Sequence, residues 1–164
     1  MNQRRQAGLT VVEFAVTGAV FMLIMFGCLE ISRLLYTWNT LTEATRAGAR
    51  IAAVCPPGND AIVKTAILNE PGGSTSSGIL QNLDTADISI QYLTASGSDS
   101  GGNRATTEFV RVAITGYQID LLIPFLDLTL TAPPFSTTLP TESLGLVPNA
   151  DPTLPGTISC LLPA

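Results

Sequence analysis

A long apolar stretch lies close to the N-terminus of the chain. Residues 11–29 contain one charged residue, Glu13, and residues 14–29 contain none. At about 1.5 Å per residue, a helix over residues 11–29 is about 28 Å long, close to the roughly 30 Å hydrocarbon core of a bilayer. The pattern predicts a membrane-spanning helix, with a helix buried in the core of a soluble domain as the alternative.

The helical pattern continues beyond this stretch. Residues 30–54 contain no proline, whereas Cys55 is followed by consecutive prolines, which cannot continue a helix. Apolar or small residues recur at helical spacing, at Leu34, Trp38, Leu41, Thr45, Gly48 and Ala52. We therefore predict one helix from about Thr10 to Val54, roughly 67 Å long. A domain of about 100 residues has a radius of gyration of only about 13 Å, so half of this helix must project from it.

The rest of the chain predicts a short helix and a few antiparallel strands. Asn59 and Asp60 can cap a second helix over residues 61–70. Strands are expected over residues 87–94, 107–122 and 126–131. The first two should form a hairpin, and the proline-rich tail after Ala132 should be irregular or contribute short edge strands. The predicted fold class is α+β, with a long N-terminal transmembrane helix and a small antiparallel sheet head.

Composition and charge narrow the function classes. Only 13% of the residues are charged, against roughly 25% in a typical soluble domain, and the mean hydropathy is +0.36. A net charge of −5 without a basic cluster argues against a nucleic-acid partner. The chain has no histidine, which excludes a histidine metal site or general base. We predict no catalytic, cofactor-binding or metal-binding residues.

The flanking charges indicate how the helix crosses the membrane. Arg4 and Arg5 precede the apolar stretch without a neighbouring acid, so the positive-inside rule places the N-terminus in the cytoplasm and the head outside. An extracytoplasmic compartment permits disulfides. We therefore predict a Cys55–Cys160 bridge that ties the proline-rich tail to the end of the helix. For a loop of about 100 residues, the loop-entropy estimate is about 4.7 kcal/mol.

A short motif marks the start of the apolar stretch. A basic leader ends in Gly8, and Glu13 is the fifth residue after that glycine. Without a side chain, Gly8 allows the backbone to enter a narrow protease cleft. Ordinary secretory signals have their small residues and cleavage site after the apolar region, whereas here the small residue comes before it.

This motif resembles the processing site of type IV pilins and pseudopilins. More narrowly, residues 8–14, the helix exit over residues 26–33 and residues 41–50 resemble TadE-like proteins, the minor pilin-like components of tight-adherence (Tad) pilus systems. The resemblance covers about the first 55 residues. It implies a pilin-like fold and cleavage between Gly8 and Leu9 by a membrane-embedded prepilin peptidase.

The resemblance also implies a division of the chain and roles for Glu13 and Phe14 in processing and assembly. The expected segments are a cytoplasmic leader (1–8), a transmembrane part (9–30), an extramembrane continuation of the helix (31–55) and an extracytoplasmic head with a proline-rich tail (56–164). A carboxylate within a span costs about 2.5 to 3.5 kcal/mol, so Glu13 needs a partner. The new α-amino group at Leu9 of a neighbouring subunit would supply one. The alternative is that Glu13 only snorkels to the membrane surface.

Small residues on the helix are candidates for close packing between chains. Ala15, Gly18 and Ala19 form such a row within the span. A second row, residues 47–49, lies beyond the span, where packing on the head and packing between chains are equally compatible with the pattern.

The sequence thus predicts a structural, non-enzymatic minor pilin-like subunit that helps to assemble a Tad-type pilus for adhesion and biofilm formation. Its expected partners are the membrane, a prepilin peptidase, other pilin-like subunits and Tad assembly proteins. It is expected in the bacterial inner membrane and, after assembly, in a surface pilus. In the alternative interpretation, residues 25–28 resemble a lipoprotein box, Cys28 is lipidated, and the chain is an anchored extracytoplasmic binding or scaffold protein outside any filament.

Overall fold

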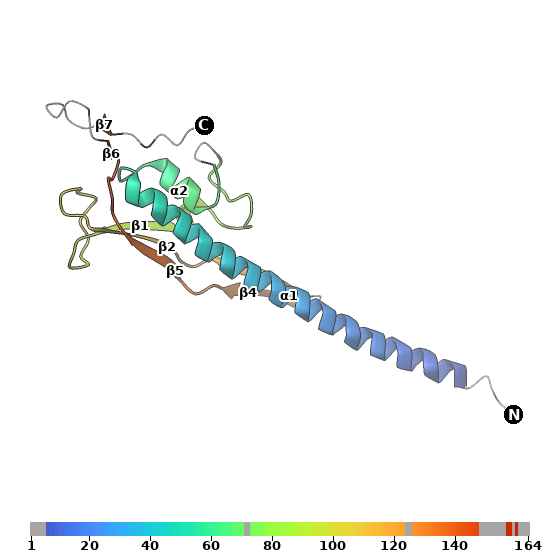
Figure 1. Ribbon diagram of the computed structural model, residues 1–164. Helices are drawn as coiled ribbons and strands as arrows, with labels where there is room; N and C mark the ends of the chain where they lie inside the picture. Colours follow the sequence, from blue (N-terminus) through green and yellow to red (C-terminus); the bar gives the residue numbers. More distant parts are fainter. Residues whose placement is uncertain (1–5, 71–72, 124–125, 148–156, 159, 161–164) are drawn as a thin grey trace.

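A long helix, α1, runs across a small head and projects far beyond it (Figure 1). The computed structural model describes residues 6–70, 73–123, 126–147, 157, 158 and 160. Helix α1 extends over Gln6–Val54, 49 residues, or about 73 Å at the α-helical rise. It ends at Val54, where the prolines after Cys55 predict its end. The long helix and the antiparallel strands that follow confirm the predicted α+β fold class.

Within the described ranges, the strands form one small sheet and two separate pairs. The elements after α1 are α2 (Asp60–Ala66), η2 (Thr85–Asp87), β1 (Ile88–Leu93), β2 (Phe109–Ile114), β3 (Gln118–Ile123), β4 (Leu126–Thr131), β5 (Phe135–Pro140), β6 (Leu146–Val147) and β7 (Thr157–Ile158). The sheet has the order β1-β2-β5, and both of its pairings are antiparallel. Strands β3 and β4 form a separate hairpin, and β6 and β7 form a short antiparallel pair. The predicted hairpin of the first two strands is confirmed as β1–β2.

Two clusters of buried side chains hold the head against α1. The first surrounds Ala49 and Ala52 and includes residues of α2, β1 and β2. The second surrounds Leu41 and Ala44 and joins residues from the loop before η2, the end of β2 and the start of β3. Helices α1 and α2 therefore cover one face of the sheet, as seen in Figure 1, and the core lies along the C-terminal third of α1.

The prediction of one strand over residues 107–122 is wrong, because the chain turns within it. Strand β2 ends at Ile114, and Gly116 then adopts a φ of 75°, which is accessible to glycine at little cost. Tyr117, the next residue, is buried in the second cluster, and β3 begins at Gln118. The turn transfers the chain from the central sheet to the separate β3–β4 hairpin.

The second helix is confirmed in position but ends earlier than residue 70. The Asn59 side chain accepts a hydrogen bond from the Ala61 N–H at 2.8 Å, which caps α2 as predicted. Leu68 has a φ of 59° and closes the C-terminal end through its N–H to the Thr65 carbonyl at 2.9 Å. A leucine in this conformation is unusual, but its side chain packs against the second cluster.

The proline-rich tail supplies the third strand of the sheet. Strand β5 pairs with β2, and no other strand among the described residues pairs with it, so it is an edge strand, as the prolines predict. The segment after β5 returns to the C-terminal end of α1. There the Glu142 N–H donates to the Ala53 carbonyl at 3.0 Å, and the Gly145 N–H donates to the Val54 carbonyl. These bonds satisfy carbonyls that have no partner within the helix.

Candidate functional site

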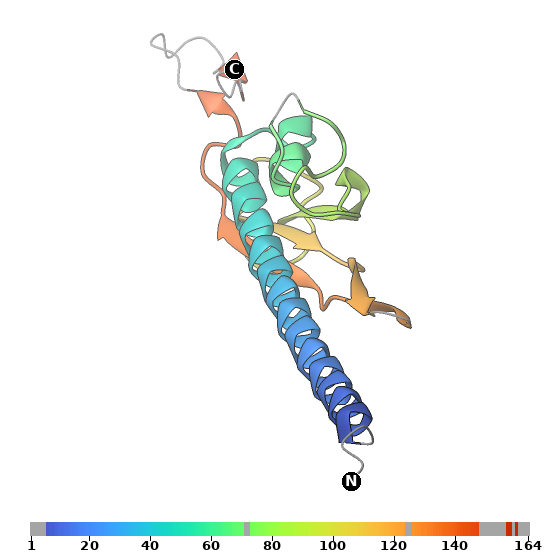
Figure 2. The same ribbon diagram turned by 90° about the vertical axis from the view of Figure 1, so that its right-hand side faces the viewer.

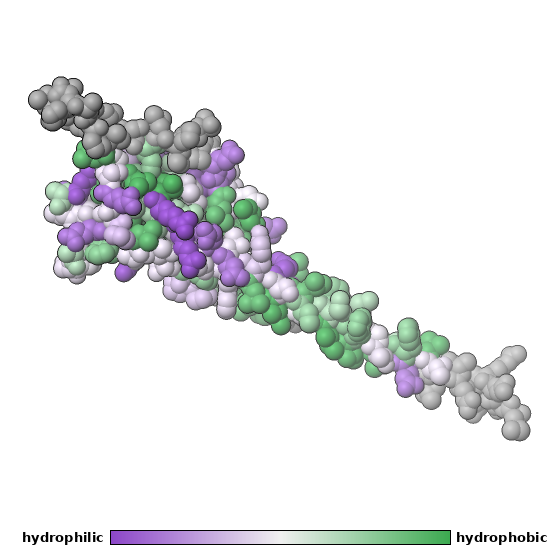
Figure 3. All heavy atoms as spheres, viewed as in Figure 1, coloured by the Kyte–Doolittle hydropathy of each residue, from purple (hydrophilic) through white to green (hydrophobic). Residues whose placement is uncertain are grey.

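The projecting half of α1 is the most distinctive surface of the molecule. Between residues 11 and 40 no residue is buried, whereas Leu41 is fully buried in the head. Within Thr10–Val54, the most apolar window has a mean hydropathy of 2.1, and none of it is buried. Figure 3 shows the hydrophobic residues along this half of the helix. By length and composition, α1 fits a single-span membrane protein.

The residues of the predicted processing motif lie at the free end of α1. The helix begins at Gln6, so Gly8 and Leu9 belong to its first turn. Glu13 is exposed, and its carboxylate has no ion pair within the part of the chain that the structure describes. Phe14 is 80% exposed. The motif is therefore presented on a helix surface that the head does not cover.

Several serine and threonine hydroxyl groups along the projecting half donate hydrogen bonds within the helix. The Thr17 hydroxyl donates to the Glu13 carbonyl at 2.9 Å, and the Ser32 hydroxyl donates to the Cys28 carbonyl at 2.8 Å. Such bonds let serine and threonine enter a membrane without water as a partner. The Thr17 and Ser32 hydroxyl groups therefore need no partner outside the helix in an apolar environment. The Glu13 carboxylate, by contrast, has no ion pair among the described residues.

The two rows of small residues have different surroundings. Ala15 and Ala19 are exposed, and a Cβ atom placed on Gly18 would have no neighbour within 4 Å. By contrast, a Cβ atom on Gly48 would lie 2.6 Å from the Ala66 Cβ atom of α2. The alternative left open for residues 47–49 is thus resolved at Gly48, which permits the close approach of α1 and α2 in the head.

A polar contact marks the point where α1 leaves the head. One Glu30 oxygen accepts from Arg33 Nη1 at 2.9 Å and from the Leu122 backbone N–H at 3.2 Å. The Glu30 side chain is only 13% exposed. Residues three positions apart on a helix can form such an ion pair, whereas the contact with β3 comes from a residue far away in the sequence. Glu30 therefore ties the β3–β4 hairpin to the helix.

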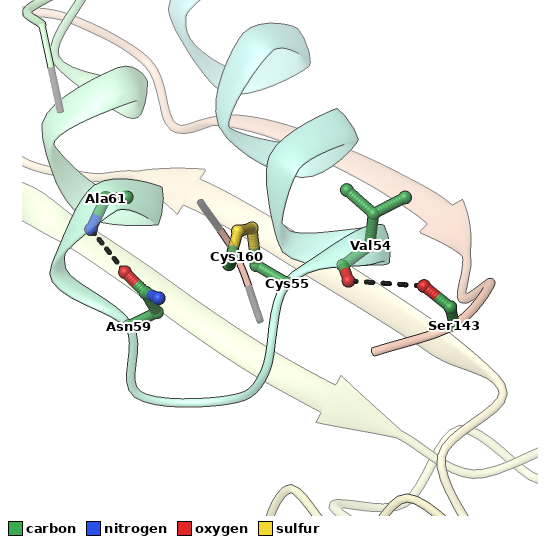
Figure 4. The surroundings of a disulfide bond; sticks show 6 residues. All are labelled: Val54, Cys55, Asn59, Ala61, Ser143 and Cys160. Carbon is green, nitrogen blue, oxygen red and sulfur yellow. Dashed lines mark hydrogen bonds between the residues drawn. A yellow bond between two sulfur atoms is a disulfide. The ribbon is translucent and has the colours of Figure 1, made fainter. Parts of the chain in front are cut away.

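A disulfide closes the opposite end of α1. Cys55 and Cys160 are bonded, with their Cα atoms 5.2 Å apart, within the range usual for disulfides. Figure 4 shows this bond between the end of α1 and the tail, next to the Ser143 hydroxyl, which donates to the Val54 carbonyl at 3.4 Å. Cys28 is free and exposed on the projecting half. The disulfide joins residues 105 positions apart in the sequence.

The head contains two tyrosines with perturbed acidity. Burial raises the pKa of Tyr92, whose hydroxyl has no hydrogen-bond partner among the described residues. Burial also raises the pKa of Tyr117, with smaller contributions from the negative charges of Asp120 and Asp87. The Tyr117 hydroxyl donates to the Gln81 carbonyl at 2.6 Å. In these surroundings both phenols have structural roles, and neither faces a nucleophile or a metal-ligand cluster among the described residues.

Comparison with known protein families finds a match that falls on α1. Residues 8–50 match the sequence model of the family described as TadE-like protein. No curated protein and no solved structure matches the chain. The matched segment contains Gly8, Glu13, the Glu30–Arg33 pair and Gly48, and it ends where α1 approaches its C-terminal turn. The helix that carries this pattern is therefore similar to TadE-like proteins, a structural, pilus-related family, over about a quarter of the chain.

Proposed function

We propose that this protein is a minor pilin-like subunit that is cut by a prepilin peptidase after Gly8 and assembles into, or initiates, a Tad-type pilus used in adhesion and biofilm formation. One observation carries the proposal. The TadE-like segment coincides with a helix whose N-terminal half is apolar and uncovered. A helix of this kind needs lipid before assembly and neighbouring helices after it, because water cannot solvate its surface favourably.

Glu13 is the residue best suited to link cleavage to assembly. Cleavage after Gly8 would create an α-amino group on Leu9, about 6 Å from Glu13 along the helix axis. The Glu13 carboxylate has no ion-pair partner among the described residues of its own chain. In lipid, an unpaired carboxylate is costly, and a neighbouring α-amino group would neutralise it. The pair forms between chains only in a defined axial register, so it would select correctly packed subunits.

The charge distribution supports a cytoplasmic leader and an extracytoplasmic head. Removal of Arg4 and Arg5 with the leader changes the balance from 8 basic and 13 acidic residues to 6 and 13, a net charge of −7. The acidic head remains on the side opposite to the basic leader, as the positive-inside rule requires. The Cys55–Cys160 disulfide is also compatible with an oxidising compartment.

The first experiment determines the mature N-terminus. The full chain is expressed with and without a prepilin peptidase, and the intact mass and N-terminal sequence of the membrane-bound protein are measured. We expect a chain that begins at Leu9 only when the peptidase is present. A Gly8→Arg substitution should leave the precursor uncut. A chain that begins at a lipid-modified Cys28 would refute the proposal and favour an anchored lipoprotein.

The second experiment tests the role of Glu13 in assembly. Filaments are sheared from cells, and the share of this protein in the filament and membrane fractions is compared among variants. Glu13→Ala should leave insertion intact and reduce incorporation strongly. Glu43→Ala is the matched control, because the Glu43 side chain is 54% exposed on the part of α1 that lies beside the head. Normal incorporation of Glu13→Ala would refute the proposed charge pairing.

A further inference from the structure

The β3–β4 hairpin forms an apolar groove with the projecting part of α1. The groove has a volume of about 340 Å³ and is lined on one side by Leu23, Phe26, Ile31 and Leu34 of α1. Leu121 and Leu122 of β3 form the other side. Glu30, which is held by Arg33 and by the Leu122 N–H, is the charged residue in this lining. In Figure 2 the hairpin projects from the head beside α1, with its tip directed away from the helix.

The helix side of this groove belongs to the predicted membrane span. Leu23 and Phe26 lie within the uncharged residues 14–29. Glu30 follows that stretch directly, and its bond to the Leu122 N–H, 3.2 Å long, fixes the level of the hairpin along the helix. If Leu23 and Phe26 are in the hydrocarbon of the bilayer, Glu30 lies near the edge of that hydrocarbon. A strand that is bonded to Glu30 then reaches the same edge.

Exposed leucines lie on both faces of the hairpin: by its register, Leu128 and Leu130 share a face with Leu121, and Leu122 lies on the other face, paired with Asp127. The side chains of Leu122, Leu128 and Leu130 are 69%, 44% and 40% exposed. Between Asp120 and Asp127 the sequence contains no charged or hydrophilic residue. None of these three leucines belongs to the two clusters that form the core of the head. Exposed apolar patches mark protein–protein or membrane contacts, and continuity with the membrane span favours the membrane here.

We propose that the β3–β4 hairpin is a second membrane contact, and that acyl chains of the leaflet on the head's side occupy the groove between Leu122 and α1. This inference rests on the proposed insertion of α1. Glu30 positions the hairpin and also satisfies the Leu122 N–H, which would otherwise lack an acceptor in lipid. Arg33 neutralises the Glu30 carboxylate at this boundary. The head is thereby held against the membrane surface at two points before assembly.

The test measures whether acyl chains reach the hairpin in the full-length protein. The chain has one tryptophan, so Trp38→Phe provides a background without tryptophan. Leu122→Trp is then placed in phosphatidylcholine–phosphatidylglycerol vesicles whose lipids are brominated on their acyl chains. We expect emission at shorter wavelength and loss of most of its intensity through bromine quenching. Since Leu122 is 69% exposed, the head should tolerate the larger side chain.

Two further tryptophan variants separate the inference from the proposed function. Phe109→Trp lies on the head at the far end of the sheet from the groove, 37% exposed, and should keep its emission in brominated lipid. Phe21→Trp lies in the apolar stretch and should be quenched if α1 is inserted. Quenching of Phe21→Trp without quenching of Leu122→Trp overturns the hairpin contact and leaves the proposed function standing.

The same measurements identify other occupants of the groove. If a second copy of the chain filled it, Leu122→Trp would emit at short wavelength but would not be quenched, even at high dilution of protein in lipid. That result overturns the inference. If Phe21→Trp also escapes quenching, then insertion of α1 fails, and the proposed function fails with it.

Discussion

The contact between α1 and α2 at Gly48 provides a quantitative test of how the head is joined to the helix. A Cβ atom added there would lie 2.6 Å from the Ala66 Cβ atom, 3.2 Å from the Ala66 Cα atom and 3.3 Å from Val112 Cγ1. Carbon atoms normally pack at about 3.5 to 4.0 Å. The Gly48→Ala substitution therefore requires the two helices to move apart, and the neighbouring Val112 side chain to move as well.

The size of the effect follows from two opposing terms. Overpacking a well-filled core costs about 1 to 3 kcal/mol. Alanine is favoured over glycine within a helix by about 1 kcal/mol, which offsets part of this cost. We therefore expect Gly48→Ala to lower the free energy of unfolding of the head by about 1 kcal/mol, and by up to about 2 kcal/mol if the backbone does not relax. Without the close approach, the same substitution would be stabilising.

Urea unfolding of the purified protein in mild detergent, followed by near-ultraviolet circular dichroism of the head, measures this change. The Ala66→Gly substitution removes the nearest methyl group, so the Gly48→Ala, Ala66→Gly pair should recover part of the loss. We expect a coupling free energy of about 1 kcal/mol between the two positions. Gly18→Ala is the matched control, because nothing lies within 4 Å of its added Cβ atom. A stabilising Gly48→Ala, or strictly additive effects, would refute the reasoning.

Three further predictions concern the disulfide and the buried tyrosines. Cys160→Ser should destabilise the oxidised head by up to about 4.7 kcal/mol in denaturant unfolding, whereas Cys28→Ser should have no effect on it. Tyr92→Phe should leave stability at neutral pH unchanged or raise it by up to about 1 kcal/mol, because the buried Tyr92 hydroxyl has no partner among the described residues. Tyr117→Phe should lower the stability by about 1 kcal/mol, because it removes the hydrogen bond to Gln81. Burial raises the pKa values of both tyrosines, so folding favours their neutral forms. This contribution to the stability of the head should be fully present below pH about 10 and lost as the pH rises through the folded-state pKa values. A pH titration of unfolding checks this, and Tyr92→Phe should weaken the alkaline loss; an unchanged profile in that variant would contradict it.

The full length of α1 is predictable because its signals are local. The apolar stretch, the helical spacing of Leu41, Thr45 and Gly48, and the prolines after Cys55 are all read directly from neighbouring residues. The same spacing identifies the face that packs on the head, and these three positions are buried in the structure. Strong periodicity over many residues leaves few alternatives for such a segment.

The turn at Gly116 could not be predicted in the same way. Apolar residues alternate on both sides of it, so the pattern from Phe109 to Leu122 is that of one long strand. The break depends on tertiary packing, because Tyr117 inserts into the second cluster while β3 pairs with β4 rather than with the sheet. The early end of α2 has a similar origin, since Leu68 takes a glycine-like conformation to reach the core.

For the candidate site, sequence motifs identify the residues on α1 but not what approaches them. Gly8 and Glu13 stand out through their spacing, and the three-residue spacing of Glu30 and Arg33 is compatible with their ion pair. The bond from the Leu122 N–H to Glu30 joins residues 92 positions apart, so no local pattern reveals it. The uncharged run between Asp120 and Asp127 is the feature of the sequence that agrees with the proposed lipid contact of this hairpin.

The positions of the small-residue row and the hairpin on α1 restrict how neighbouring helices can approach. At about 3.6 residues per turn, the row formed by Ala15, Gly18 and Ala19 lies roughly a quarter of a turn from the face that carries Glu30 and Leu34. The hairpin therefore does not cover the row, and it lies farther along the helix. A partner helix can pack closely on the small residues if it diverges from the hairpin side as it approaches the head. This geometry favours contacts between spans that are close near Glu13 and more open near Glu30, where acyl chains can still enter the groove.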